Sequence, residues 1–350
     1  MLRNLAVGNL TVFRAADFRF CGGVNVIIGE NGSGKSHLLK MAYSLIAAGA
    51  ERNGSPSSAT PVKSTLQRTL ATKLINVMRP ESLGRLVRRR TGRQRCRIAL
   101  EFEDSALDCA ISFAAANRSE VNVDDCPAAW QEKAPVFLPP HELLTLYPGF
   151  VAVYDGHYLE FDEIHRDTCV LLGQPLPRDS RKEVAAAQID PIEREMGGTV
   201  ELDANGRFYL KVLGRNPIEM PLVAEGHRKL AMLARLIATG SLLGSGYLFW
   251  DEPEANLNPR LIKSVALAIL GLARDGIQVF LATHSLFLLR ELEILSKNDD
   301  FGDVEHRYFA LAIGTDGVRV EQGDVADELQ TLILLDENLQ QSDRYLTLQD

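Results

Sequence analysis

The amino-acid sequence predicts an α/β fold that is organised around a phosphate-binding loop. Residues 24–28 (VNVII) form a short apolar, β-branched run, as expected of a buried strand. Residues 29–36 follow directly and match G-x-x-x-x-G-K-[ST], and residues 37–48 have the composition of a helix. Strand, glycine-rich loop and helix in this order are the context in which the motif binds phosphate. Two later apolar runs, residues 247–250 and 277–282, end in Asp-Glu-Pro-Glu and in Thr-His-Ser.

Composition limits the classes of protein to which the chain can belong. With 350 residues, 46% of them hydrophobic and 24% charged, it can hold one large α/β domain or two lobes. The formal net charge of −8 argues against a uniformly basic surface but leaves room for a local basic patch. The five cysteines are scattered and never spaced C-x-x-C, so we expect neither a disulfide framework nor a zinc site. We also expect no signal peptide and no membrane span, and therefore a cytoplasmic protein.

The other elements are predicted from periodicity and turn residues. Strands are expected at residues 5–13, 16–20, 98–102, 109–113, 120–123, 136–138, 307–313 and 318–320, and helices at 64–77, 225–239, 258–273 and 285–295. Residues 143–196 have a helical and loop-rich pattern, and residues 52–61 are rich in Gly, Pro and Ser, as in a loop. Residues 199–212 predict a β-hairpin, because Asn205 and Gly206 would supply the two positive-φ positions of a type I′ turn.

The glycine-rich loop predicts a site for a nucleoside triphosphate. Its backbone N–H groups can surround the phosphates, and the N-terminus of the following helix adds its positive end. Lys35 is predicted to hold the β- and γ-phosphates, and Ser36 to place its hydroxyl on Mg²⁺. The nucleotide-binding residues are assigned as Gly29, Glu30, Asn31, Gly32, Ser33, Gly34, Lys35, Ser36 and His37.

The ends of the two later apolar runs supply candidates for catalysis. Asp251 ends a strand, where its carboxylate can reach Mg²⁺ directly or through water. Glu252 is one residue further and can act as general base on the water that attacks the γ-phosphate. If the two strands are neighbours, His284 lies beside these acids and can contact the γ-phosphate.

The loop at residues 29–36, the run 251–259 (DEPEANLNP) and residues 283–285 (THS) together resemble the ABC-type ATPases of the SMC/RecF/OLD group. The resemblance covers residues 1–50 and 223–295 well. It implies a P-loop NTPase of ABC-ATPase type with a mixed sheet core and an inserted, mainly helical lobe. Residues 1–140 would form the first part of lobe I, residues 141–225 lobe II, and residues 226–350 the rest of lobe I. Two such heads would enclose two ATP molecules and Mg²⁺ in a homo-oligomer and hydrolyse ATP slowly, as a clamp or switch.

The resemblance also implies a signature segment that touches the nucleotide of another subunit. Glu225, Gly226 and His227 occupy that place, at the start of a predicted helix. The residue before them is Ala224, where the usual motif has a serine, and Arg228 or Lys229 is a candidate substitute in charge.

Two further segments correspond to family motifs. Asn256 and Asn258 fall in the D-loop, which contacts the opposite subunit in the family. The family often places a Mg²⁺-sensing glutamine after the strand that here precedes Pro139-Pro140. No glutamine is present, which leaves His141 or Glu142 as its replacement, with Glu142 a candidate metal ligand, or an ordinary Pro-Pro turn.

The segment from Arg85 to Arg97 contains seven arginines and no interleaved aromatic residue. It is a candidate for contact with DNA or with an acidic partner protein, or it is a solvated hairpin. Two functions remain open. One is the sensor or regulatory ATPase of an OLD-like, multi-component antiphage system that controls a separately encoded effector. The other is a RecF-like, DNA-binding ATPase of repair and recombination.

Overall fold

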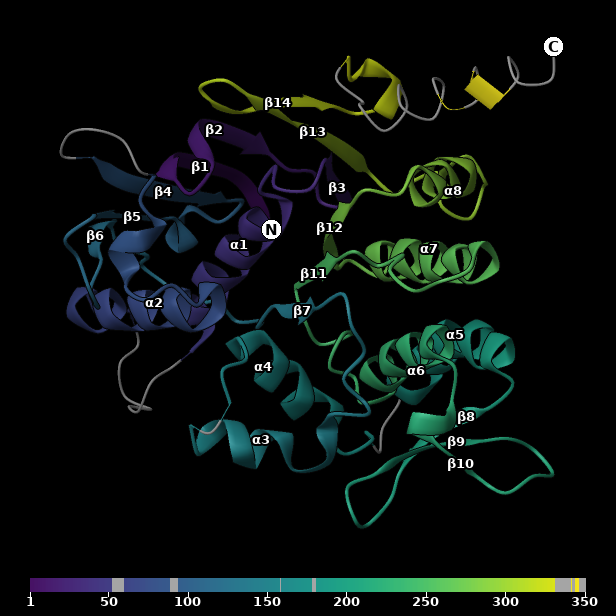
Figure 1. Ribbon diagram of the computed structural model, residues 1–350. Helices are drawn as coiled ribbons and strands as arrows, with labels where there is room; N and C mark the ends of the chain where they lie inside the picture. The colour runs from purple at the N-terminus through teal and green to yellow at the C-terminus, as the bar shows by residue number, and fades with distance from the viewer. Residues whose placement is uncertain are drawn as a thin grey trace.

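The structure, a computed structural model, is shown in Figure 1. It describes residues 1–51, 60–88, 94–157, 159–177, 181–330, 341 and 344–345, without the side chains of residues 181–184. Most of the loop predicted at residues 52–61 and the middle of the arginine-rich segment lie outside the described residues.

A mixed sheet of six strands forms the centre of the molecule. Its strands are β3 (Val24–Gly29), β7 (Val136–Leu138), β11 (Tyr247–Asp251), β12 (Gln278–Thr283), β13 (His306–Gly314) and β14 (Gly317–Gly323), in the order β14-β13-β3-β12-β11-β7. All neighbours are parallel except the β13–β14 hairpin. The inner strands are buried on both faces, which explains their continuous apolar sequences.

A second, antiparallel sheet covers one side of the centre. It contains β1 (Leu2–Leu10), β2 (Phe13–Arg19), β4 (Arg95–Phe102), β5 (Cys109–Ala114) and β6 (Asn122–Asp125), in the order β2-β1-β4-β5-β6. Its inner face shares a core with α1 (Lys35–Ala50), α2 (Lys63–Met78) and one face of the central sheet. The buried Gln278 side chain joins the two sheets, because it accepts a hydrogen bond from Leu2 N and donates one to Leu2 O.

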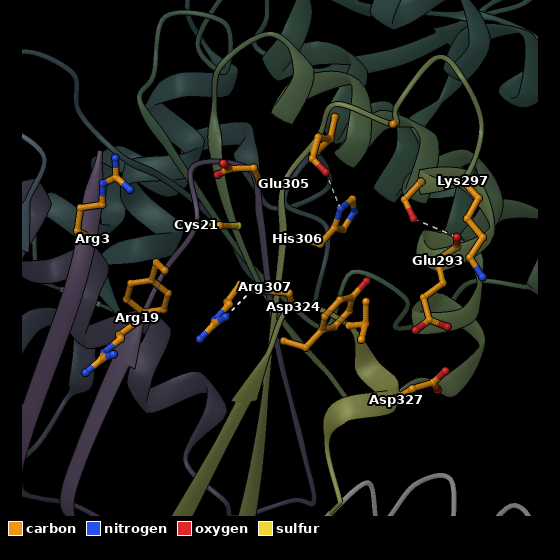
Figure 2. Close-up of a pocket in the computed structure, with 16 residues that line it drawn as sticks. Arg3, Arg19, Cys21, Glu293, Lys297, Glu305, His306, Arg307, Asp324 and Asp327 are labelled. Atoms are coloured by element: carbon orange, nitrogen blue, oxygen red, sulfur yellow. Dashed lines mark hydrogen bonds and ion pairs between the residues drawn. The ribbon is translucent and has the colours of Figure 1, made fainter.

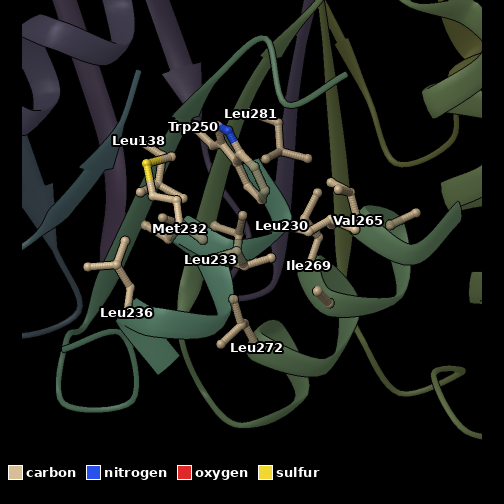
Figure 3. Close-up of a cluster of buried hydrophobic side chains, with 14 of the residues drawn as sticks. Leu138, Leu230, Met232, Leu233, Leu236, Trp250, Val265, Ile269, Leu272 and Leu281 are labelled. Atoms are coloured by element: carbon tan, nitrogen blue, oxygen red, sulfur yellow. The ribbon is translucent and has the colours of Figure 1, made fainter. Parts of the chain in front are cut away.

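Helices α6 (Glu225–Ala238), α7 (Pro259–Arg274) and α8 (Leu286–Ser296) cover the opposite face of the central sheet. Figure 3 shows Leu230, Met232 and Leu233 of α6 beside Trp250 of β11. The helices at 258–273 and 285–295 begin where the sequence predicts, because the side chains of Asn258 and Ser285 cap the N-termini of α7 and α8.

The segment between β7 and α6 is mainly helical. It contains α3 (Tyr147–Asp155), α4 (Glu163–Leu172) and α5 (Arg181–Met196), followed by a small sheet of β8 (Thr199–Leu202), β9 (Phe208–Lys211) and β10 (Ile218–Glu219). Arg235 of α6 donates hydrogen bonds to the carbonyls of Leu172 and Gln174 and so anchors α6 to this segment. The α/β fold with a mixed central sheet and an inserted helical part, as predicted, is confirmed.

The β8–β9 hairpin is where the sequence predicts it, but its turn is not type I′. Gly206 has a positive φ of 75°, whereas Asn205 is not among the positive-φ residues. Asp203 organises the loop instead: its carboxylate accepts from the N–H groups of Asn205 and Arg207, and its carbonyl accepts from Gly206 N. These local bonds favour a longer loop with a single left-handed glycine over the two-residue turn.

The interface between α6 and the central sheet provides a stability test. Leu233→Ala should lower the free energy of unfolding by about 2–5 kcal/mol, because Leu233 is fully buried in the cluster of Figure 3. Leu213→Ala is the matched control, since Leu213 is 99% exposed and should change it by less than about 0.5 kcal/mol. Chemical denaturation measures the free energy of unfolding of both variants. Equal losses of this free energy would contradict the packing of Leu233 against the sheet.

Candidate functional site

The candidate site lies at one edge of the central sheet, where β3, β12 and β11 end. In the parallel register Ile28 of β3 is opposite Thr283 of β12, and Ala282 is opposite Asp251 of β11. The glycine-rich loop, the acidic run and the Thr-His-Ser segment therefore leave the sheet side by side. Open α/β sheets bind ligands beyond the carboxyl ends of such strands.

The glycine-rich loop joins β3 to the N-terminus of α1. Gly32 and Gly34 have positive φ values of 83° and 95°, which only glycine adopts without strain. A Cβ at Gly34 would lie 2.6 Å from Cγ2 of Val12 and 3.0 Å from the Phe13 ring, so the β1–β2 turn packs tightly against the loop. Glu30, Asn31 and Gly32 are exposed at its tip.

Lys35 lies inside this loop. Its Nζ donates to the carbonyls of Gly29 and Glu30, at 2.7 and 3.0 Å, and the residue is almost fully buried. Burial lowers the pKa of Lys35, while the nearby carboxylates of Glu252 and Asp251 oppose that shift. The ammonium group is thus held where a bound phosphate would compete with the two carbonyls.

Ser36 and Asp251 form the part of the site that fits a magnesium ion. Asp251, which is 5% exposed, lies beside Ser36 of α1. Burial raises the pKa of Asp251, and the nearby Ser36 hydroxyl acts in the opposite direction. Its Oδ1 is buried and has no hydrogen-bond partner in the described part of the chain, which is expected of an oxygen that binds a metal ion. Carboxylate and hydroxyl oxygens suit Mg²⁺, which would take its other ligands from phosphate and water.

Glu252 and His284 lie together beside this pair. Nδ1 of His284 is 3.4 Å from Oε1 of Glu252, and both side chains are partly exposed toward the site. Glu252 has a positive φ of 48°, and its N–H donates to Ala282 O of β12 at 2.8 Å. The arrangement predicted for strand ends therefore brings these two residues into contact.

Glu254 has a role that the sequence did not indicate. It is buried, and its Oε1 accepts from the Thr283 hydroxyl at 2.7 Å and from His284 N at 3.2 Å. It therefore fixes the Thr-His-Ser segment against the acidic run. The position of Glu254 in the Asp-Glu-Pro-Glu run could have indicated a role in the site. Its partners could not be predicted, because they depend on which strand lies next to β11.

The start of α6 packs against the run that follows Asp251. Glu225 accepts a hydrogen bond from Nδ2 of Asn256 at 2.8 Å. Gly226 is buried, and a Cβ there would lie 2.8 Å from Leu261 and 3.3 Å from Asn256 O. His227 is half-buried, whereas Glu225 is exposed. The expected signature and D-loop segments are thus neighbours within one chain.

Asn258 and Glu142 have other partners in the structure. Asn258 caps α7 by accepting from Leu261 N. Glu142 forms a nearly buried ion pair with Arg228, at 3.0 Å, and accepts hydrogen bonds from the Thr145 hydroxyl and backbone. These contacts connect the segment after β7 to α6 and do not include Ser36 or Asp251. A metal-ligand role for Glu142 stays a prediction.

Lys229, which the sequence offers as a charge substitute for the signature serine, instead binds backbone groups inside its own chain. It is 2% exposed, and its Nζ donates to the carbonyls of Glu252 at 2.7 Å and Ala255 at 3.2 Å. Burial lowers the pKa of Lys229 to about 8, although Glu254, Glu252, Glu225 and Asp251 act in the opposite direction. The available signal was a lysine within the apolar stripe of an amphipathic helix.

The described arginines of the basic segment do not form one patch. Arg85 pairs with Glu81, and Arg88 donates to Asp316 O. Arg95 and Arg97 are exposed on the outer face of the antiparallel sheet, where they line a groove of about 960 Å³.

Two other hollows lie outside the strand-end site, one beside the glycine-rich loop and one at the opposite edge of the sheet. A groove of about 490 Å³ borders the loop, between Gly32, the β1–β2 turn and the β13–β14 turn. Figure 2 shows a pocket of about 700 Å³ at the opposite edge of the sheet, where His306 is opposite Val24. Two of its acidic side chains have partners, Asp324 in an ion pair with Arg307 and Glu305 in a hydrogen bond from Gly22 N. The geometry therefore favours the carboxyl edge as the functional site.

Comparisons with known proteins concern the fold and one segment of the chain. Residues 153–290 match the family model "AAA domain, putative AbiEii toxin, Type IV TA system". The fold is similar to an SMC head domain from Thermotoga maritima (14% identity, TM-score 0.51, covering 93% of this chain and 99% of that one). It is also similar to an Smc head bound to the C-winged helix domain of ScpA (13% identity, TM-score 0.59, covering 93% of this chain and 98% of that one). A third match is an Smc head with an extended coiled coil, bound to the C-terminal domain of ScpA derived from Pyrococcus furiosus (13% identity, TM-score 0.54, covering 96% of this chain and 98% of that one).

A search of curated proteins gives no match. The chain has the fold of an SMC/ABC-type ATPase head, with the P-loop NTPase architecture. None of the described helices combines the length and the apolar character that crossing a bilayer requires.

Gly34 offers a test of the loop geometry. Gly34→Ala should lower the free energy of unfolding by about 2–4 kcal/mol and weaken ATP binding, because it adds left-handed strain to the collision with Val12 and Phe13. Gly32→Ala is the control, since its Cβ would meet nothing within 4 Å and only the strain of about 1 kcal/mol applies. Chemical denaturation and nucleotide titration measure both effects.

Lys229 makes stability depend on pH. Its pKa is about 8 in the folded chain against 10.5 for the unperturbed group, so between these values the unfolded chain binds more protons. The cost of burying the charge is complete below pH 8 and disappears as the pH rises toward 10.5. From pH 8 to 9 the wild type should therefore gain about 1 kcal/mol of unfolding free energy relative to Lys229→Met. Parallel pH profiles in urea denaturation would contradict the burial of a charged Lys229.

Proposed function

We propose that the protein is an ATP hydrolase that acts as an ATP-dependent switch or clamp. The observation that carries this proposal is the convergence of Lys35, Ser36, Asp251, Glu252 and His284 at one edge of the sheet. A phosphate-binding loop, a metal-binding carboxylate and a second carboxylate free to bind water are the parts that phosphoryl transfer to water requires.

Each residue has a distinct task in this proposal. Lys35 exchanges its bonds to the loop carbonyls for the β- and γ-phosphate oxygens. Ser36 and Asp251 would hold Mg²⁺, which would neutralise charge on the phosphates when bound. Glu252 takes a proton from the attacking water, and His284, in contact with Glu252, orients toward the γ-phosphate.

The proposed active form is an assembly of two heads around two nucleotides. The N-terminus of α6 supports it, because Ala224 and Glu225 are exposed there and no side chain caps the helix. A second head's γ-phosphate can approach this end, with Glu225, Gly226 and His227 as the contacting segment and Asn256 beside it.

For the biological role we favour the regulatory ATPase of a multi-component antiphage system in the cytoplasm, acting on a separately encoded partner. The name of the matching family model, which refers to a putative AbiEii toxin, supports this direction. Two of the similar Smc heads carry a bound domain of ScpA, so a head of this fold can hold a separate protein.

A RecF-like function on DNA is the second candidate. Arg95 and Arg97 favour it, because both are exposed beside a groove whose floor contains small side chains such as Ala6, Ala99 and Ala110. DNA binding that falls steeply with salt and is lost in Arg95→Ala/Arg97→Ala would support this candidate over the antiphage role.

The first test uses Glu252→Gln. This variant should bind Mg·ATP normally but lose about 100-fold or more in kcat, because the amide cannot accept the proton of water. Light scattering with Mg·ATP should then show a dimer that persists, since hydrolysis no longer separates the heads. Glu132→Gln, exposed at the opposite edge beside the start of β11, is the control and should leave kcat unchanged.

If the Glu252→Gln variant hydrolyses ATP with the kcat of the wild type, the assignment of Glu252 as general base is refuted. A monomer with and without nucleotide would refute the two-head assembly.

A further inference from the structure

We infer that Lys229 is the positioning residue for Glu252, and that it joins the first turns of α6 and the loop from Glu252 to Leu257 into one rigid unit. The inference rests on the proposed role of Glu252 and adds to it a route by which that role is controlled.

The backbone of Glu252 is held from both sides. Its N–H donates to Ala282 O of β12, and its carbonyl accepts from Nζ of Lys229. The same ammonium group binds Ala255 O, and Ala255 N donates to Glu252 O at 3.0 Å, so Lys229 closes both ends of this turn. A φ of 48° is unfavourable for a non-glycine residue, and this conformation persists where surrounding bonds hold it in place.

The environment of Lys229 is suited to a cation and not to an apolar side chain alone. Its position continues the buried face of α6, where Leu230 and Leu233 face the sheet. Its stem can pack there as a leucine would, but its charged end requires bonded partners, because burying an unpaired ammonium group is costly. The carbonyls of Glu252 and Ala255 supply the bonds, and the surrounding carboxylates supply negative charge.

Two further contacts between the same elements make the connection stiff. Asn256 donates to Glu225, and Gly226 packs so closely on Asn256 and Leu261 that a side chain would collide. A displacement of the N-terminus of α6 must therefore move the turn that carries Glu252. Since the exposed end of α6 is where a second head is proposed to bind, its arrival would reach Glu252 through Lys229 by direct contacts.

The experiment compares Lys229→Met with Lys73→Met. Methionine has a similar length and keeps the apolar stem while removing all the donors. Lys73 is also a buried lysine, but it binds Glu163 and Asp167 between α2 and α4, away from the site. Lys229→Gln is the second variant in case the methionine variant does not fold, since its shorter amide cannot reach both carbonyls.

Lys229→Met should reduce kcat by about tenfold or more while ATP affinity stays within about twofold, because only the alignment of Glu252 is lost. Without nucleotide, amide hydrogen exchange of residues 252–257 should become about tenfold faster in this variant. Lys73→Met should leave both the kcat and the exchange of this segment unchanged, whatever its effect on overall stability.

Unchanged kcat and unchanged exchange in Lys229→Met, or in Lys229→Gln, would overturn the inference. So would a loss of ATP affinity equal to the loss of kcat, since that is the result of a general structural defect. Failure of the proposed function is recognised separately. If the wild type does not hydrolyse ATP, or if Glu252→Gln does, that function fails, and the exchange measurement still decides whether Lys229 holds the turn.

Discussion

The parallel register of β3, β12 and β11 is the constraint on which the rest of the site depends. It aligns Ile27 with Ala282, Ile28 with Thr283, and Ala282 with Asp251, so that three separate loops leave the sheet at one edge. The register is strongly fixed because these strands are buried on both faces. A slip by one residue would exchange the side chains of the two cores and would also move the acids away from the phosphate loop.

Features encoded within short segments could be predicted from the sequence. The glycine-rich loop, the apolar strands around it and the starts of α7 and α8 depend on periodicity and on caps such as Asn258 and Ser285. Strand order could not be predicted, because the neighbours of β3 come from beyond residue 277. The turn of the β8–β9 hairpin was predicted wrongly, although it is local, because the carboxylate of Asp203 competes for the same N–H groups as a type I′ turn.

The site shows the same division. Lys35, Ser36, Asp251, Glu252 and His284 could be proposed from the sequence because each follows directly from a strand end or a motif. The contacts of Glu254 and Lys229 could not be predicted, and Lys229 was given a different role, because their partners lie 23 to 30 positions away along the chain and only the fold shows which groups they reach. Glu142 illustrates the converse: its position matches a family motif, but Arg228 already neutralises its carboxylate.

Ala224 changes how α6 can meet an anion. A serine at this N-cap position can bond either to its own helix or to a phosphate, and without it the first N–H groups of α6 have no side-chain cap. The helix loses about 1 kcal/mol in this way, but its free donors and positive end stay exposed at Ala224 and Glu225. Lys229, one turn further, binds the carbonyls of Glu252 and Ala255 and so keeps that helix end attached to the turn that begins at Glu252. An anion at this helix end could therefore be bound by the backbone N–H groups of α6, which Lys229 keeps in place, without a serine hydroxyl at position 224.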